Sequence, residues 1–106
     1  MQTSARKEAR HPVKLPATVR HTKSPRLINA PLLDLSTQGC KIASEEPFIS
    51  GTAVLVKIPG IENWPATVIW AKRRFVGFEF DNALSSYVVE HYVRQFGPPA
   101  GGAEPR

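Results

Sequence analysis

The sequence predicts a mainly β protein, a six-stranded antiparallel β-barrel with one C-terminal α-helix. Two observations indicate this class. Short apolar runs, several with alternating apolar and polar side chains, recur between residues 12 and 80 and are separated by turn-forming residues. Near residue 83 the apolar positions change to a helical period. Short strands at this spacing, with little helix, favour a closed or partly closed barrel over a parallel sheet.

Length and composition indicate one domain. The chain has 106 residues, of which 42% are hydrophobic and 22% charged, values typical of a globular domain. The opening residues lack the apolar segment of a secretory signal, and no apolar run approaches a membrane span in length. A single cysteine, Cys40, cannot form an internal disulfide. We therefore expect a cytoplasmic monomer without membrane insertion.

The first third of the chain contains an arm and two strands. Residues 1–11 show no periodicity, so we expect a flexible arm, followed by a folded domain over 12–97. Residues 13–19 alternate between apolar and polar, which predicts a strand that Pro16 confines to an edge or an irregular position. A loop over 21–26 leads to a second strand over 27–33, interrupted by Pro31.

Four more strands are expected over residues 40–42, 53–58, 64–71 and 75–80. Pro59-Gly60 ends the fourth strand, and residues 72–74 connect the last two as a solvated hairpin. Trp64 and Trp70 lie an even number of positions apart and should point to the same face, where packing is the simplest role. A tryptophan at the barrel mouth could also stack on a purine.

The helix is expected over residues 83–96, where Leu84, Val88 and Tyr92 recur every four positions. Asp81 or Asn82 should cap its start. Gly97 should end it in the left-handed conformation, with prolines following. Residues 98–106 are expected to form a disordered tail.

The strongest candidate site combines a polar turn with an upstream pair of arginines. Asp34, Ser36 and Gly39 offer a carboxylate acceptor, a hydroxyl, and a position where the backbone can adopt positive φ or approach a ligand closely. Arg6 and Arg10 carry guanidinium groups suited to phosphate or to the O6/N7 edge of guanine. The formal charge of +5 is also concentrated in the first quarter of the chain, which suggests an anionic partner.

These residues resemble the PilZ family, whose members carry an RxxxR arm followed by a DxSxxG turn. Downstream, Val68-Ile69-Trp70 and Val76-Gly77-Phe78-Glu79-Phe80 are similar to the family's late strand pair. The resemblance covers nearly the whole chain. It implies a small split β-barrel that binds the bacterial second messenger cyclic di-GMP.

The resemblance also implies a role for each motif residue. Arg6 and Arg10 would engage phosphate and the O6/N7 edges, and Asp34 would accept from guanine N1–H and N2–H. Ser36 would add a hydroxyl contact, and Gly39 would let the turn backbone come close to the ligand. Secondary contacts could come from Lys7, Trp70 and Arg73.

We expect no output module, so the domain would act as a receptor or adaptor for an unidentified effector protein. The signal would be closure of the arm over the barrel mouth, because the arm has no apolar residue to hold it there without ligand. Before Arg6, families of this type can carry a further arginine that helps to hold a second ligand. Ala5 stands there, so we expect one cyclic di-GMP per domain.

Two other functions stay open. Net charge and barrel aromatics would suit a nucleic-acid-binding barrel, although the basic residues concentrate at one end and the aromatics mostly face the core. The second open function is a PilZ-like protein-interaction module that binds no nucleotide. We expect no enzyme, cofactor or metal site, because no histidine lies at metal-ligand spacing from a cysteine or carboxylate and Ser36 lacks a general base nearby in sequence. Cys40 is expected to be a small buried hydrophobe.

Overall fold

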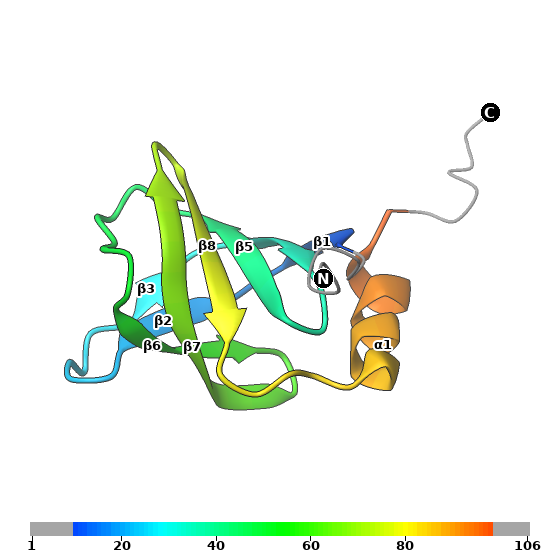
Figure 1. Ribbon diagram of the computed structural model, residues 1–106. Coiled ribbons are helices and arrows are strands. Elements are labelled where there is room, and N and C mark those ends of the chain that lie inside the picture. Colours follow the sequence, from blue (N-terminus) through cyan, green and yellow to red (C-terminus); the bar gives the residue numbers. More distant parts are fainter. Residues whose placement is uncertain (1–9, 99–106) are drawn as a thin grey trace, which may run out of the picture.

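The computed structural model describes residues 10–98 and contains one antiparallel sheet with a C-terminal helix (Figure 1). The elements are β1 (His11–Leu15), β2 (Thr18–His21), β3 (Ile28–Asn29), β4 (Leu32–Leu35), β5 (Gly39–Ala43), β6 (Ala53–Ile58), β7 (Ile61–Lys72), β8 (Phe75–Phe80) and α1 (Ser86–Phe96). The strands neighbour one another in the order β1-β4-β5-β8-β7-β6-β2-β3. The mainly β, antiparallel class with a C-terminal helix is thus confirmed, and β6 and β8 have the predicted bounds.

The predicted number of six strands is wrong, because each of the first two predicted strands is two strands. Proline has no backbone N–H to donate to a sheet, and Pro16 and Pro31 stand at the two breaks. Between the breaks, the Ala30 N–H donates to the Ala17 carbonyl at 2.9 Å and keeps the two chains together. β1 then pairs with β4, whereas β2 pairs with β3 and β6.

This broken hairpin supplies both ends of the sheet. β1 and β4 lie at one end of the strand order, and β2 and β3 lie at the other. Within residues 10–98 the pairings stop at β1 and β3, so the sheet does not close into a continuous ring of strand pairs. Arg10 and the start of β1 therefore lie beside the β4–β5 turn, where the candidate site was expected.

The core follows from the alternation of side chains along the strands. Inward residues are fully buried on several strands, among them Val19, Leu32, Ile42 and Val54. Cys40 is fully buried with them, which confirms the prediction of a small buried hydrophobe. Burial, and secondarily the charge of Asp34, raises the pKa of the Cys40 thiol far above its ordinary value.

The helix begins later than predicted, at Ser86, and its cap is neither Asp81 nor Asn82. Ser85 caps it instead, with its side-chain oxygen accepting the Val88 N–H at 3.2 Å. The two predicted caps serve β7: Asp81 accepts from the Thr67 hydroxyl, and the Asn82 carbonyl accepts from the Trp64 indole. A serine closer to the first apolar turn outcompetes them.

The helix ends at Gly97 as expected, but not in the left-handed conformation. Gly97 has φ −82° and ψ 177°, an extended backbone. Glycine is needed for space, because a Cβ there would lie 2.4 Å from the Val93 carbonyl oxygen, which accepts the Gly97 N–H. α1 packs against β1, and the Tyr92 hydroxyl donates to the Pro59 carbonyl. No helix in the described part of the chain is long and apolar enough to cross a membrane.

Candidate functional site

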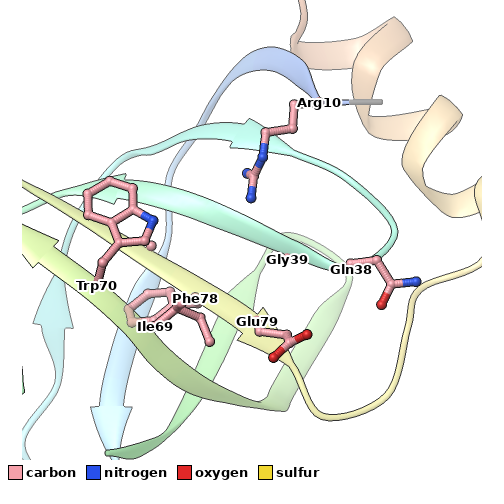
Figure 2. A pocket seen from close by; sticks show the side chains of 8 residues that line it. Arg10, Gln38, Gly39, Ile69, Trp70, Phe78 and Glu79 are labelled. Carbon is pink, nitrogen blue, oxygen red and sulfur yellow. The ribbon is translucent and has the colours of Figure 1, made fainter. Parts of the chain in front are cut away.

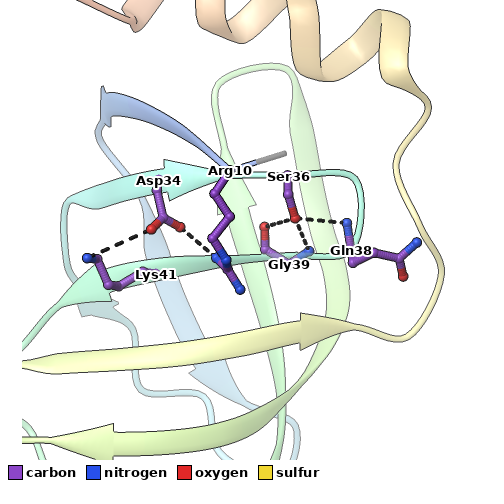
Figure 3. A network of polar contacts seen from close by, with 6 residues as sticks. All are labelled: Arg10, Asp34, Ser36, Gln38, Gly39 and Lys41. Carbon is purple, nitrogen blue, oxygen red and sulfur yellow. Dashed lines mark hydrogen bonds and ion pairs between the residues drawn. The ribbon is translucent and has the colours of Figure 1, made fainter. Parts of the chain in front are cut away.

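The β4–β5 turn is shaped by Ser36. Its side chain is fully buried, and its oxygen accepts the backbone N–H groups of Gln38 and Gly39, each at 3.1 Å (Figure 3). The Ser36 N–H in turn donates to the Gly39 carbonyl at 2.9 Å. A serine side chain that bonds the backbone two or three residues later is a common way to fix a turn. In this structure the hydroxyl faces the turn and not the solvent.

Gly39 is required by its neighbouring strand. It lies in β5 opposite Glu79 of β8, and a Cβ there would lie 2.1 Å from the Phe78 carbonyl oxygen. Gly39 is not among the glycines with positive φ, so the expected turn conformation is not the reason for it. The glycine allows close approach of β8, and its backbone also lines the cavity described below.

Asp34 joins the start of the domain to the turn. Its carboxylate accepts from the Arg10 guanidinium at 2.9 Å through Oδ1, and the Lys41 ammonium lies 3.8 Å from Oδ2 (Figure 3). The Asp34 side chain is 17% exposed, and that of Arg10 is 50% exposed. Arg10 and Asp34, 24 positions apart in sequence, meet because β1 pairs with β4. The structure thus brings the predicted arginine and acid together.

A cavity of about 190 Å³ lies beside this ion pair (Figure 2). Arg10 and Gln38 line it from the β1 and turn side, and Trp70 and Glu79 line it from β7 and β8. Gly39 and Gly77 contribute only backbone to its wall. An aromatic ring, a guanidinium and a carboxylate therefore face one small open hollow on the outer face of the sheet.

The position of Trp70 corrects the prediction that both tryptophans point to the same face. Val68 pairs with Phe78 but Trp70 pairs with Gly77, so Ile69 is an extra residue that shifts the register. Paired residues share a face, and Phe78 is in the core, so Trp70 lies on the outer face with Gly77. Trp64 packs against the core.

The indole of Trp70 lies across Gly77. A Cβ on Gly77 would lie 2.3 Å from the indole Nε1 and 2.4 Å from Cε2, so the ring occupies the space that a side chain would need. Glycine at this position lets the ring lie close to the sheet and form one wall of the cavity. This geometry agrees with a platform for a planar group.

The remaining predicted residues lie elsewhere. Arg73 is in the β7–β8 turn with φ +52°, at the end of β8 away from the cavity, where the Arg74 carbonyl accepts from Ser44 N–H. In Figure 1 this turn projects away from α1. Arg6, Lys7 and Ala5 fall outside the described residues, as does most of the expected arm and tail.

Sequence reasoning missed four residues of the site: Gln38, Lys41, Gly77 and Glu79. Lys41 of β5 pairs with Asp34 of β4, and Glu79 of β8 pairs with Gly39 of β5. Strand pairing therefore brings Lys41 and Glu79 to the predicted site. The signal was present in the alternation, which places Lys41 outward between buried Cys40 and Ile42. It could be used only once the pairing of β4, β5 and β8 was known.

Comparison with known proteins agrees with this geometry, since residues 4–95 match the PilZ domain family. The chain belongs to the PilZ family. PilZ domains are a family of cyclic di-GMP receptors and are typically non-catalytic. The match spans both the arginine pair and the turn, so the suspected resemblance is confirmed at the level of the family.

A solved structure titled Bacillus subtilis inhibitor of motility, MotI/DgrA, has a similar fold, with a TM-score of 0.60 and 16% sequence identity. The match covers 90% of this PilZ chain but 52% of the MotI/DgrA chain, so the chain spans about half the length of that protein. No curated protein matches the chain. Within residues 10–98, no three histidine, cysteine, aspartate or glutamate side chains gather as metal ligands.

Proposed function

We propose that this PilZ domain is a cyclic di-GMP receptor and that its site is the β4–β5 turn with the adjoining cavity. The observation that carries the proposal is the meeting of Arg10 and Asp34 beside a hollow walled by Trp70. A guanidinium, a carboxylate and an aromatic face are complementary to phosphate, to guanine donors and to a purine ring, respectively.

The motif residues divide into those that meet the ligand and those that hold the turn. Arg10, with Arg6 from the arm, binds phosphate and the O6/N7 edge of guanine, and Asp34 accepts from guanine donors. Ser36 is buried and bonded within the turn, so its role is to fix the turn backbone. Gly39 allows β5 and β8 to approach each other beneath the ligand.

The ion pair between Arg10 and Asp34 must be rearranged when ligand binds. Asp34 already accepts from Arg10 and lies near Lys41, so the incoming ligand competes with the carboxylate for the guanidinium. Ion pairs that solvent reaches on one side, as it reaches the half-exposed Arg10, contribute only about 1 kcal/mol, which bound ligand can replace. Rearrangement of Arg10 would move the arm that precedes it. We infer that arm closure over one bound cyclic di-GMP creates the surface that an effector protein reads.

Calorimetric titration with cyclic di-GMP, with GTP and a short oligonucleotide as controls, tests the proposal. The Arg10→Ala variant should lose about 2–5 kcal/mol of binding free energy, because it leaves charged partners unpaired. Arg94→Ala is the matched control, since Arg94 is an exposed arginine on α1. Equal affinity of Arg10→Ala and Arg94→Ala would refute the assigned site. Tight oligonucleotide binding that cyclic di-GMP cannot displace would favour a nucleic-acid-binding barrel.

A further inference from the structure

Glu79 carries a second carboxylate that the two sequence motifs do not include. It lies on β8 between Gly39 of β5 and Thr67 of β7, and it is exposed on the outer face of the sheet. Its side chain lines the same cavity as Arg10 and Trp70 (Figure 2). Across residues 10–98, this carboxylate has no hydrogen bond or ion pair with another side chain, whereas Asp34 has two basic neighbours.

The charge of the cavity determines which part of a nucleotide can enter it. A phosphate beside Glu79 would meet a like charge at short range, which is unfavourable even near a protein surface. A base has no such conflict. At about 190 Å³, the cavity is smaller than the roughly 300–1,000 Å³ of sites that enclose a drug-sized ligand, so it suits one base with the rest of the ligand outside.

The polar groups also select among bases. Guanine presents acceptors at O6 and N7 and donors at N1–H and N2–H, so it matches a guanidinium on one side and a carboxylate on the other. Adenine carries a lone pair at N1 and a donor at N6, and it has no N2 amino group. A carboxylate placed to accept from N1–H and N2–H would lose both donors with adenine and would meet the N1 lone pair instead.

We propose that Glu79 is a specificity-determining residue that accepts from N1–H and N2–H of a guanine held in this cavity. The base rests against Trp70 and the bare backbone of Gly77, with Arg10 toward its O6/N7 edge. Asp34 then lies on the side of the site formed by Arg10 and Lys41, where it accepts from donors on the rest of the ligand. This assignment rests on the proposed function and extends it to the choice between guanine and adenine dinucleotides.

The test compares Glu79→Gln with the wild-type protein in titrations with cyclic di-GMP and cyclic di-AMP. Glutamine keeps the shape but loses the charge and replaces one acceptor with a donor. We expect cyclic di-GMP to bind about ten- to a hundredfold more weakly, because hydrogen bonds to charged groups are the stronger ones. Cyclic di-AMP binding should not weaken, so the preference for guanine shrinks.

Glu90→Gln on the exposed face of α1 is the matched control and should leave both affinities unchanged. Thermal melting checks folding, and neither variant removes a contact that stabilises the described domain. If Glu79→Gln binds cyclic di-GMP as tightly as the wild-type protein and Glu90→Gln do, the role of Glu79 is overturned but the proposed function is not. If the wild-type protein binds no cyclic di-GMP, the proposed function fails as well.

Discussion

At the scale of single residues, Asp34 and Ser36 lie two positions apart, at the end of β4 and in the turn that follows it, and have different surroundings. Asp34 is partly exposed and contacts Arg10, whereas Ser36 is buried and bonds the turn backbone. Sequence reasoning identified both positions but could not separate a residue that meets ligand from one that shapes the turn. That distinction depends on where β4 ends, because Asp34 lies in the strand opposite Lys41, whereas Ser36 follows the strand and bonds the turn backbone.

Asp34→Ala should weaken cyclic di-GMP binding by about 2–5 kcal/mol, because it removes a carboxylate acceptor and leaves Arg10 without its neighbour. Stability should change by only about 1 kcal/mol, since Arg10 is half exposed and solvent screens the ion pair from that side. Calorimetry and thermal unfolding measure the two effects separately. A variant that binds within a few-fold of wild type would show that Asp34 does not contact the ligand.

Ser36→Ala should lower the free energy of unfolding, which Asp34→Ala leaves nearly unchanged. The change leaves the N–H groups of Gln38 and Gly39 without their acceptor, at a cost of about 1–3 kcal/mol of unfolding free energy. Thr37→Ala, in the same turn, is the control, because that side chain is partly exposed. Denaturant unfolding compares the two variants. Equal stability of both would contradict the turn-forming role of Ser36.

Because the Cys40 thiol is buried, we expect the protein to lose stability at alkaline pH. Its pKa is raised by burial, so the folded protein keeps the proton that the unfolded chain releases near the ordinary value of 9.0. The contribution is complete below that pH and is lost as the pH rises further, because the unfolded state then binds fewer protons. Denaturant unfolding from pH 7 to above 10 should show a shallower decline for Cys40→Ala than for wild type. Parallel declines would exclude this cause.

At the scale of elements, the sequence was sufficient where alternation ran uninterrupted. β6 and β8 match their predicted bounds because both are short and follow turn residues. The two long strands at the start of the chain divide at Pro16 and Pro31, since proline breaks the ladder and allows each half to pair with a different neighbour. Irregularity at proline was foreseeable, but the new partner of each half was not.

The extra residue Ile69 had the largest effect on the site. Parity along β7 predicts Trp70 on the same face as Trp64, and a single register shift moves it to the outer face. No residue type in this stretch marks a bulge, because Ile69 is an ordinary strand residue. The position of Trp70 therefore depended on the pairing with β8.

Gly77→Ala tests the platform formed by these two strands. The added methyl group would overlap the Trp70 indole, so the ring must move and one wall of the cavity is lost. We expect weaker cyclic di-GMP binding, by up to the roughly 1–3 kcal/mol that base–aromatic stacking contributes. In a Trp70→Ala background the same methyl has room and should have little further effect. Additive losses in the double variant would contradict this explanation.

At the scale of the whole molecule, the fold connects β1, the β4–β5 turn and α1. β1 packs against α1 (Figure 1). The turn carbonyl of Gln38 accepts from Phe80 N–H at the end of β8, and that of Thr37 accepts from Leu84 N–H in the segment that leads to α1. A change at the turn is thus connected to the helix through backbone hydrogen bonds. The family could be recognised from the motifs, but this connection required the fold.

An NMR titration of the labelled protein with cyclic di-GMP would show whether the ligand binds at the β4–β5 turn and the adjoining cavity. We expect saturation at one ligand per chain, with shifts concentrated at Gln38, Gly39, Glu79 and the indole of Trp70. The indole of Trp64, bonded to Asn82 on the other side of the sheet, is an internal control that should move little. The absence of shifts at excess ligand, or shifts gathered around Arg26 and Arg74 at the far end of β5 and β8, would contradict this expectation.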